Sequence, residues 1–174
     1  MFKSSRIIYT AVACICIIGL AYPDVYAAKY VNRDLSFEVP GGWHEIKGMG
    51  LKGVEAAFTK EIDSEITPIM LIAIDSRVGD STLKDVVEKA MSVVTSTIPD
   101  AKFLFERDVY TGNVKWREII YQYSDAGYAF QAVQSHTIDN KKHFVFTGQS
   151  LQSDFREYLP EFRKTFDTWQ FKTD

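Results

Sequence analysis

Every second side chain is apolar in residues 35–39, which read Leu-Ser-Phe-Glu-Val. This alternation predicts a β-strand with one buried face and one solvated face. Pro40 cannot donate a hydrogen bond to a sheet, and the Gly41–Gly42 pair tolerates positive φ, so a sharp turn is expected there. Trp43 starts a short continuation to Ile46, and we expect its ring to fold back onto the same core.

Strands and loops are also expected in the next part of the chain. Residues 54–59 alternate between apolar and polar positions, whereas residues 69–74 are all apolar. These patterns predict a half-buried strand followed by a central strand that is covered on both faces. Residues 28–34 are interpreted as a polar lead-in, and residues 60–67 as a loop.

The period changes in residues 83–98, where apolar side chains recur at steps of three and four. Such steps predict an amphipathic helix. Ser81 or Thr82 can cap its N-terminus, and Asp85 lies in the first turn, where negative charge is favourable. Pro99 is expected to end the helix.

A period of two returns in residues 101–149, interrupted by turn signals at Gly112–Asn113, Asp125–Gly127 and Asp139–Asn140. Connections this short predict four antiparallel strands in a meander. In the last segment, large apolar residues at 155, 159, 162, 166 and 169 indicate another amphipathic helix.

Pro160 is unfavourable in a helix interior, so we expect one helical turn before it and the main helix after it. Residues 169–171 are expected to form a short closing strand. The element order predicts an α+β fold, in which a mostly antiparallel, twisted sheet is flanked by helices. The 46% hydrophobic content suffices for a packed core, and we predict a single domain over residues 28–174.

Residues 1–27 have the features of a signal peptide. Lys3 and Arg6 precede an apolar run at 7–22, and Val25-Tyr26-Ala27 has the small-x-small character of a cleavage site after Ala27. The run is shorter than the roughly 20 residues that a membrane span needs, which disfavours an uncleaved anchor. Lipid attachment at Cys14 is a further alternative, although the residues around it match a lipobox only loosely.

Cleavage after Ala27 would leave a domain without cysteine, because Cys14 and Cys16 both lie in the leader. Disulfides, thiol nucleophiles and cysteine-ligated metals are then excluded. Losing the three charged leader residues changes the formal net charge from −3 to −4. A mildly acidic domain has no electrostatic reason to bind nucleic acid, so no nucleic-acid partner is expected.

Residues 34–43, Asp-Leu-Ser-Phe-Glu-Val-Pro-Gly-Gly-Trp, resemble the opening F-x-(I/V)-P-x-G-W strand of the PsbP/Mog/DcrB-like superfamily. Phe37, Pro40, Gly42 and Trp43 carry the resemblance, and the order of elements continues it over about residues 30–172. The resemblance implies an α/β/α sandwich and a non-enzymatic role. Members of the superfamily bind other proteins: a photosystem II extrinsic subunit, a Ran-binding import factor and bacterial envelope proteins. No catalytic residue transfers, because the matched positions contain none.

The segment Gly48–Gly53 matches the dinucleotide-binding pattern G-x-G-x-x-G, and Asp75 stands at the end of an apolar strand beyond it. Helical steps from Val54 would complete that motif, but the meander does not provide the further βα units of a nucleotide-binding fold. We therefore interpret the segment as a loop. Its apolar residues Met49 and Leu51 are candidate contacts for a protein partner, unless they pack against Trp43.

His136 and His143 flank the turn signal at Asp139–Asn140. If those two residues form the loop, the register places the histidines opposite one another, where they could share a metal ion. No third ligand is apparent, so the simpler interpretation is a pair of half-exposed strand residues. No cofactor is predicted.

Catalysis has little support in the pattern. His44 has no nucleophile motif beside it, and Glu118 is expected to pair with Arg117 or Arg107 at the sheet surface instead of acting as a general acid. Aromatic residues of the meander could line an open sheet face, although core packing is the simpler account. They are Tyr110, Trp116, Tyr121, Tyr123, Tyr128 and Phe130.

The sequence therefore predicts a non-catalytic, periplasmic or secreted module that binds a protein partner in the cell envelope. Membrane association is expected only through an uncleaved leader. The alternatives are a small-ligand or metal-binding envelope protein and, with less support, a hydrolase.

Overall fold

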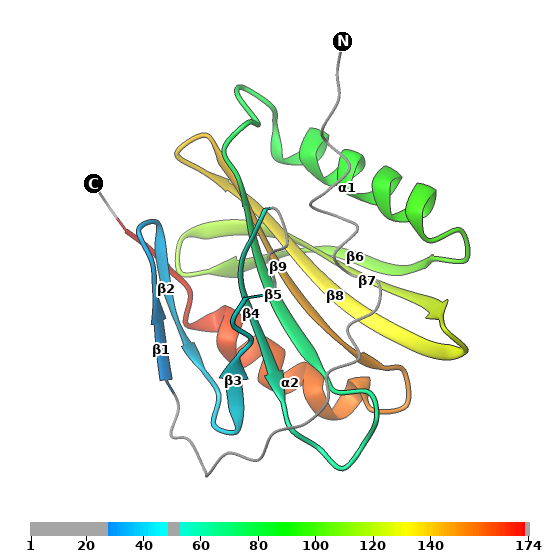
Figure 1. The fold of residues 1–174 in the computed structure, drawn as a ribbon. Helices are drawn as coiled ribbons and strands as arrows, with labels where there is room; N and C mark the ends of the chain where they lie inside the picture. The colour runs from blue at the N-terminus through cyan, green and yellow to red at the C-terminus, as the bar shows by residue number, and fades with distance from the viewer. Residues whose placement is uncertain (1–27, 49–52, 173–174) are drawn as a thin grey trace.

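The computed structural model describes residues 28–48 and 53–172 of the 174-residue chain. The predicted leader, Met49 and Leu51 lie outside the described residues. Runs of strands are separated by the two helices α1 and α2, which is the α+β arrangement that the pattern predicted (Figure 1). In chain order the elements are β1 (Ala28–Val31), β2 (Leu35–Val39), β3 (Trp43–Glu45), β4 (Val54–Lys60), β5 (Ile69–Asp75), α1 (Leu83–Thr97), β6 (Lys102–Thr111), β7 (Val114–Asp125), β8 (Tyr128–Asp139), β9 (Lys142–Leu151), α2 (Phe155–Asp167) and β10 (Gln170–Phe171).

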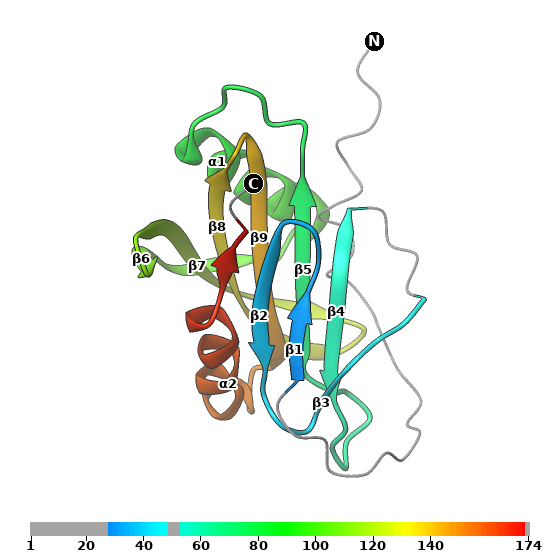
Figure 2. The same ribbon diagram turned by 90° about the vertical axis from the view of Figure 1, so that its left-hand side faces the viewer.

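Two antiparallel sheets form the scaffold. The larger has seven strands in the order β3-β4-β5-β9-β8-β7-β6, and the smaller has the order β1-β2-β10. The four strands of the predicted meander are consecutive in the larger sheet. The smaller sheet and α2 lie over one face of the larger sheet, and α1 lies on the other (Figures 1 and 2).

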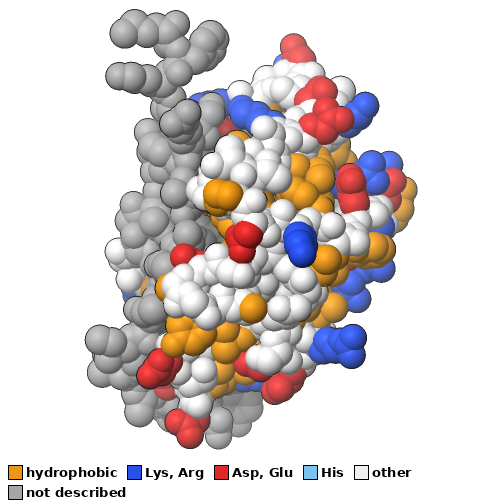
Figure 3. All heavy atoms as spheres, turned by 90° about the vertical axis from the view of Figure 1, so that its right-hand side faces the viewer, with side chains coloured by type: hydrophobic (Ala, Val, Ile, Leu, Met, Phe, Trp, Pro, Cys, Tyr) orange, Lys and Arg blue, Asp and Glu red, His pale blue; other side chains and the backbone are white. Residues whose placement is uncertain are grey.

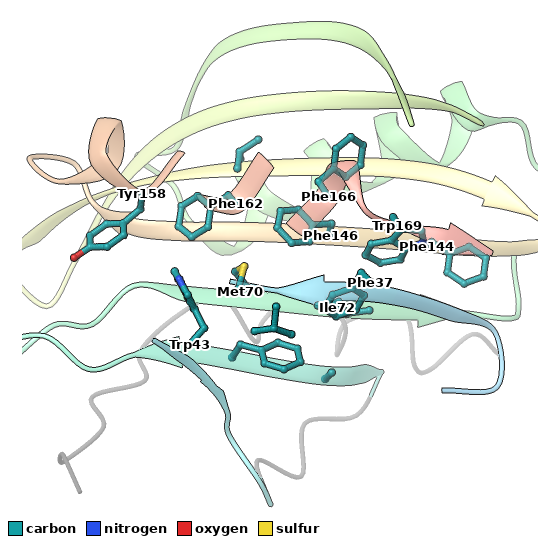
Figure 4. Packing of buried hydrophobic residues seen from close by; sticks show 14 of the residues in the cluster. Phe37, Trp43, Met70, Ile72, Phe144, Phe146, Tyr158, Phe162, Phe166 and Trp169 are labelled. Atoms are coloured by element: carbon teal, nitrogen blue, oxygen red, sulfur yellow. The ribbon is translucent and has the colours of Figure 1, made fainter. Parts of the chain in front are cut away.

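The main core lies between the larger sheet and the layer formed by α2 and the smaller sheet (Figure 4). Phe37 of β2 stacks on Trp169 with ring centroids 5.4 Å apart. Trp43 folds back as expected: its ring meets Phe162 of α2 edge-on at 5.7 Å, and its indole N–H donates to the carboxylate of Glu161. The opening segment thus contacts α2 through Trp43 and the residue Trp169 beyond that helix through Phe37.

The interpretation of residues 28–34 as a polar lead-in was wrong, because residues 28–31 form β1. Its backbone pairs with β2, with Ala28 opposite Val39. The Tyr30 ring stacks on Phe37 at a centroid distance of 4.9 Å, and this contact across the strands is not visible in the period of so short a segment. As a result β2 is the middle strand of the smaller sheet, while β3 is an edge of the larger one.

Helix α1 has the predicted cap. The Thr82 hydroxyl accepts from the Asp85 backbone N–H, and the Asp85 side chain accepts from the Thr82 N–H, which completes a capping box. The buried face of α1 includes Val87 and Ala90 and packs over β7 and β8 to form a second core.

The prediction for the last helix was wrong about Pro160. Helix α2 begins at Phe155, and Pro160 lies inside it. A proline in a helix interior costs about 3 kcal/mol. That cost is offset because the continuous helix buries Phe155, Tyr158 and Phe162, and each large apolar side chain contributes roughly 1.5–3 kcal/mol when it leaves water.

Helix α2 packs closely on β9 at Gly148. A Cβ atom at this position would lie 2.5 Å from Cγ of Phe162. Gly148→Ala is therefore expected to lower the free energy of unfolding by about 1–3 kcal/mol, because the ring or the helix must move. Urea unfolding would measure the loss. Phe162→Leu also removes packing, but the double variant should lose less than the sum of the two single variants, and strict additivity would contradict a direct clash.

Candidate functional site

The two candidate metal ligands lie side by side on β8 and β9. The rings of His136 and His143 stack with centroids 5.3 Å apart and an angle of 17° between planes, and Nδ1 of His136 lies 3.1 Å from Nε2 of His143. That distance is suitable for a hydrogen bond between two neutral imidazoles, one as donor and one as acceptor.

The register that was predicted for this pair is wrong by one position in the turn. Asn140 and Lys141 form the loop, both with positive φ, so Asp139 pairs with Lys142. His143 is consequently opposite Ile138. The histidines are diagonal neighbours on one sheet face, where side chains still meet.

The histidines are buried, not half-exposed. Burial lowers the pKa of His143 to about 4, although nearby Asp75 opposes the shift. Burial also holds the pKa of His136 well below its ordinary value, and the charge of His143 adds to this effect. Nε2 of His136 has no hydrogen-bond partner. The pair is therefore neutral at physiological pH.

A metal ion would need further ligands. Within residues 28–48 and 53–172, no group of three His, Cys, Asp or Glu side chains is placed to hold one. Asp75 lies opposite His143 on β5, but its carboxylate accepts from Nε of Arg77 at 2.8 Å. The geometry favours a hydrogen-bonded pair inside the fold over an open metal centre.

The lowered pKa values predict that the protein loses stability in mild acid. Between pH 6.5 and about 4 the unfolded chain binds protons that folded His143 does not, so the free energy of unfolding falls as pH drops through this window. The loss from His143 alone should reach roughly 2 kcal/mol near pH 5. Urea unfolding near pH 7.5 and pH 5 would measure it.

The double variant His136→Gln/His143→Gln should show a smaller loss between the two pH values. His44→Gln is the matched control, because His44 lies on β3, which β4 and β5 separate from β9. An unchanged pH dependence in the double variant would show that other groups cause it.

A second polar cluster surrounds Glu118 of β7. Its carboxylate oxygen Oε1 lies 2.8 Å from Nη2 of Arg107 on β6 and 3.2 Å from Nη2 of Arg163 on α2. Pairing with Arg107 was expected, but the surface position was wrong, because Glu118 is buried. Arg117 faces the opposite side of the sheet. Arg163 was missed, since no sequence spacing connects residue 163 with residue 118.

Strand β6 is an outer strand of the larger sheet and, among the described elements, pairs only with β7 (Figure 2). It carries exposed apolar side chains: Leu104 is 49% exposed, Phe105 44% and Tyr110 63%. We call this strand, with its free backbone edge, the β6 edge. Figure 3, which shows the side with the β7–β8 turn, has further apolar side chains among charged ones.

Most of the aromatic residues that could have lined an open face are instead in the core. Tyr110 and Tyr128 are the exposed members of that set. The dinucleotide alternative is contradicted by the fold: the chain after Gly53 forms β4 and not a helix, and the strand pairs of both sheets are antiparallel.

Comparison with protein-family models and with curated proteins yields no sequence match. Solved structures that resemble the chain include three proteins at low identity. A protein of unknown function from Pseudomonas aeruginosa, described as a putative regulator, aligns over 85% of this chain and 99% of its own, with a TM-score of 0.64 and 14% identity.

Cyanobacterial PsbP (CyanoP) from Synechocystis sp. PCC 6803 aligns over 90% of this chain and 99% of its own, with a TM-score of 0.61 and 15% identity. LpqN of Mycobacterium tuberculosis, which is involved in cell envelope biogenesis, aligns over 87% and 90%, with a TM-score of 0.63 and 12% identity. The chain thus has the PsbP-like fold, which confirms the predicted resemblance at the level of the fold. A kinship with Mog or DcrB stays a prediction.

Proposed function

We propose that the protein is a non-catalytic, exported module that binds another protein in the cell envelope through the β6 edge. The observation that carries this proposal is a ten-residue outer strand with three exposed apolar side chains. A free backbone edge attracts other chains, and β6 presents such an edge over ten residues. A long edge with aromatic residues is typical of a contact surface.

The charged groups that chemistry would require are used within the fold. The Glu118 carboxylate is bound by two arginines, and the histidine pair is neutral and buried. A general acid or base needs access to a substrate, and these groups are enclosed by sheet and helix. Their arrangement supports a structural role for the histidine pair and for the Glu118 carboxylate.

The proposed compartment is the periplasm or the exterior, reached after removal of residues 1–27. Involvement of LpqN in cell envelope biogenesis supports this proposal by analogy of fold. None of the described helices is long and apolar enough to cross a membrane.

Cleavage of the leader predicts that the mature protein begins at Ala28. N-terminal sequencing of the protein expressed from its full reading frame in the native host would identify the first residue. A protein that retains residue 1 and stays in the membrane fraction would contradict cleavage and would favour the uncleaved anchor.

Contact through the β6 edge predicts site-specific crosslinking in the native host. A photo-reactive amino acid at Tyr110 or Leu104 should crosslink to the same envelope protein. The control site is Glu88, an exposed residue on α1 whose side chain is 63% exposed. Equal products from Glu88 and the β6 positions, or no product from either β6 position, would contradict the proposal.

A further inference from the structure

We infer that the partner adds an extended segment to β6 as an extra strand and presents an acidic side chain to Arg107 and Arg163. This inference rests on the proposed function and specifies the chemistry of the partner. It combines two observations on one edge of the molecule: a free strand with exposed apolar side chains, and an excess of positive charge on one face of that strand.

The backbone of β6 provides the first part of the site. Along Lys102–Thr111 the strand pairs with β7 on one side, and no described strand pairs with the other side. An added strand satisfies the free backbone groups of such an edge, and side-chain pockets on alternate positions then provide specificity.

The two faces of the edge differ in charge. On the face toward α1, Glu106 and Asp108 are balanced by basic residues of β7, with contacts of 3.1 Å from Arg117 to each and 2.8 Å from Lys115 to Asp108. On the face toward α2, the single carboxylate of Glu118 is shared by two guanidinium groups. The cluster of Arg107, Glu118 and Arg163 on that face therefore carries one uncompensated positive charge.

The arginines have donors to spare. Their side chains are 40% and 38% exposed for Arg107 and Arg163, and both use the same oxygen of Glu118. Because a guanidinium group has several N–H donors in a planar fork, a second carboxylate beside Glu118 would find donors that the fold leaves unused.

The positions on this face define the pattern of the partner. Phe105, Arg107 and Val109 are alternate residues of β6 and share one face, and the Arg107 guanidinium lies 5.2 Å from the centre of the Phe105 ring. A paired strand places its own alternate residues opposite them. The expected segment has an acidic residue with apolar residues two positions before and after it.

A second copy of this chain fits the edge less well. A two-fold axis can pair β6 of one copy with β6 of a second copy as antiparallel strands. The two copies then form one continuous sheet only in registers in which one residue of β6 lies opposite the same residue of the other copy. Central registers then place Glu106 against Glu106 or Arg107 against Arg107, and like charges directly opposite each other are destabilising.

The test uses a display library of random peptides selected on the purified protein. Peptides with an acidic residue between two apolar residues at a spacing of two should be enriched. Addition of an enriched peptide should shift the backbone amide NMR signals of β6 in the protein. Arg163→Gln should lower the affinity for an enriched peptide about tenfold or more, because a charge-assisted hydrogen bond is lost. Arg163→Lys should lower this affinity less.

Arg117→Gln is the matched control, since it removes the same charge from the opposite face of this edge and should leave the peptide affinity unchanged. Arg163→Gln retains the Arg107–Glu118 pair, and thermal unfolding would verify that the variant is folded. Selection of peptides without the acidic residue, no selection at all, equal affinity for Arg163→Gln, or a β6-mediated dimer would each overturn the inference. Crosslinking from Tyr110 to an envelope protein despite such a result would leave the proposed function standing with a different mode of contact.

Discussion

The contacts between aromatic rings on the α2 side of the larger sheet are the constraint on which the rest of the structure depends. Trp169 stacks on Phe37 and meets Trp116 of β7 edge-on at 5.2 Å, and Trp116 in turn meets Phe166 of α2 at 4.9 Å. Such pairs contribute about 0.5–1.5 kcal/mol each beyond the burial of their area. They join the first strands, the meander and the last helix, which are far apart in the sequence (Figure 4).

The same packing positions the groups of the candidate site. Helix α2 can approach β9 only because residue 148 has no side chain, and this approach places Arg163 over Glu118. One arginine would balance the charge of the buried Glu118 carboxylate, whereas two arginines leave an excess of positive charge at the free side of β6. The packing of the core thus determines the charge at the β6 edge, although the core residues themselves are not exposed there.

The other face of the sheet shows that buried polar groups need not be functional. The histidine pair lies beside Asp75, and burial together with the charge of Lys89 lowers the pKa of His143. Shifted pKa values of this kind are often found at active sites. The burial of the pair and the hydrogen bond between its rings indicate a structural element that lowers the stability of the protein in acid. The β6 edge, by contrast, has ordinary residues in an unusual position, and its significance comes from what is exposed.

The sequence by itself determined the local structure: the strands at 35–39 and 69–74, the capped helix at 83 and the meander follow from periods and turn residues that act within a few positions. The tertiary structure alone decided whether Pro160 could lie inside a helix, because only the burial of the surrounding aromatic rings offsets its cost. It also decided the strand at residues 28–31, the register of the histidines and the meeting of Arg163 with Glu118. These features depend on contacts between segments that are distant in the chain, or on turn geometry that differs by one residue, and neither leaves a periodic signal in the sequence.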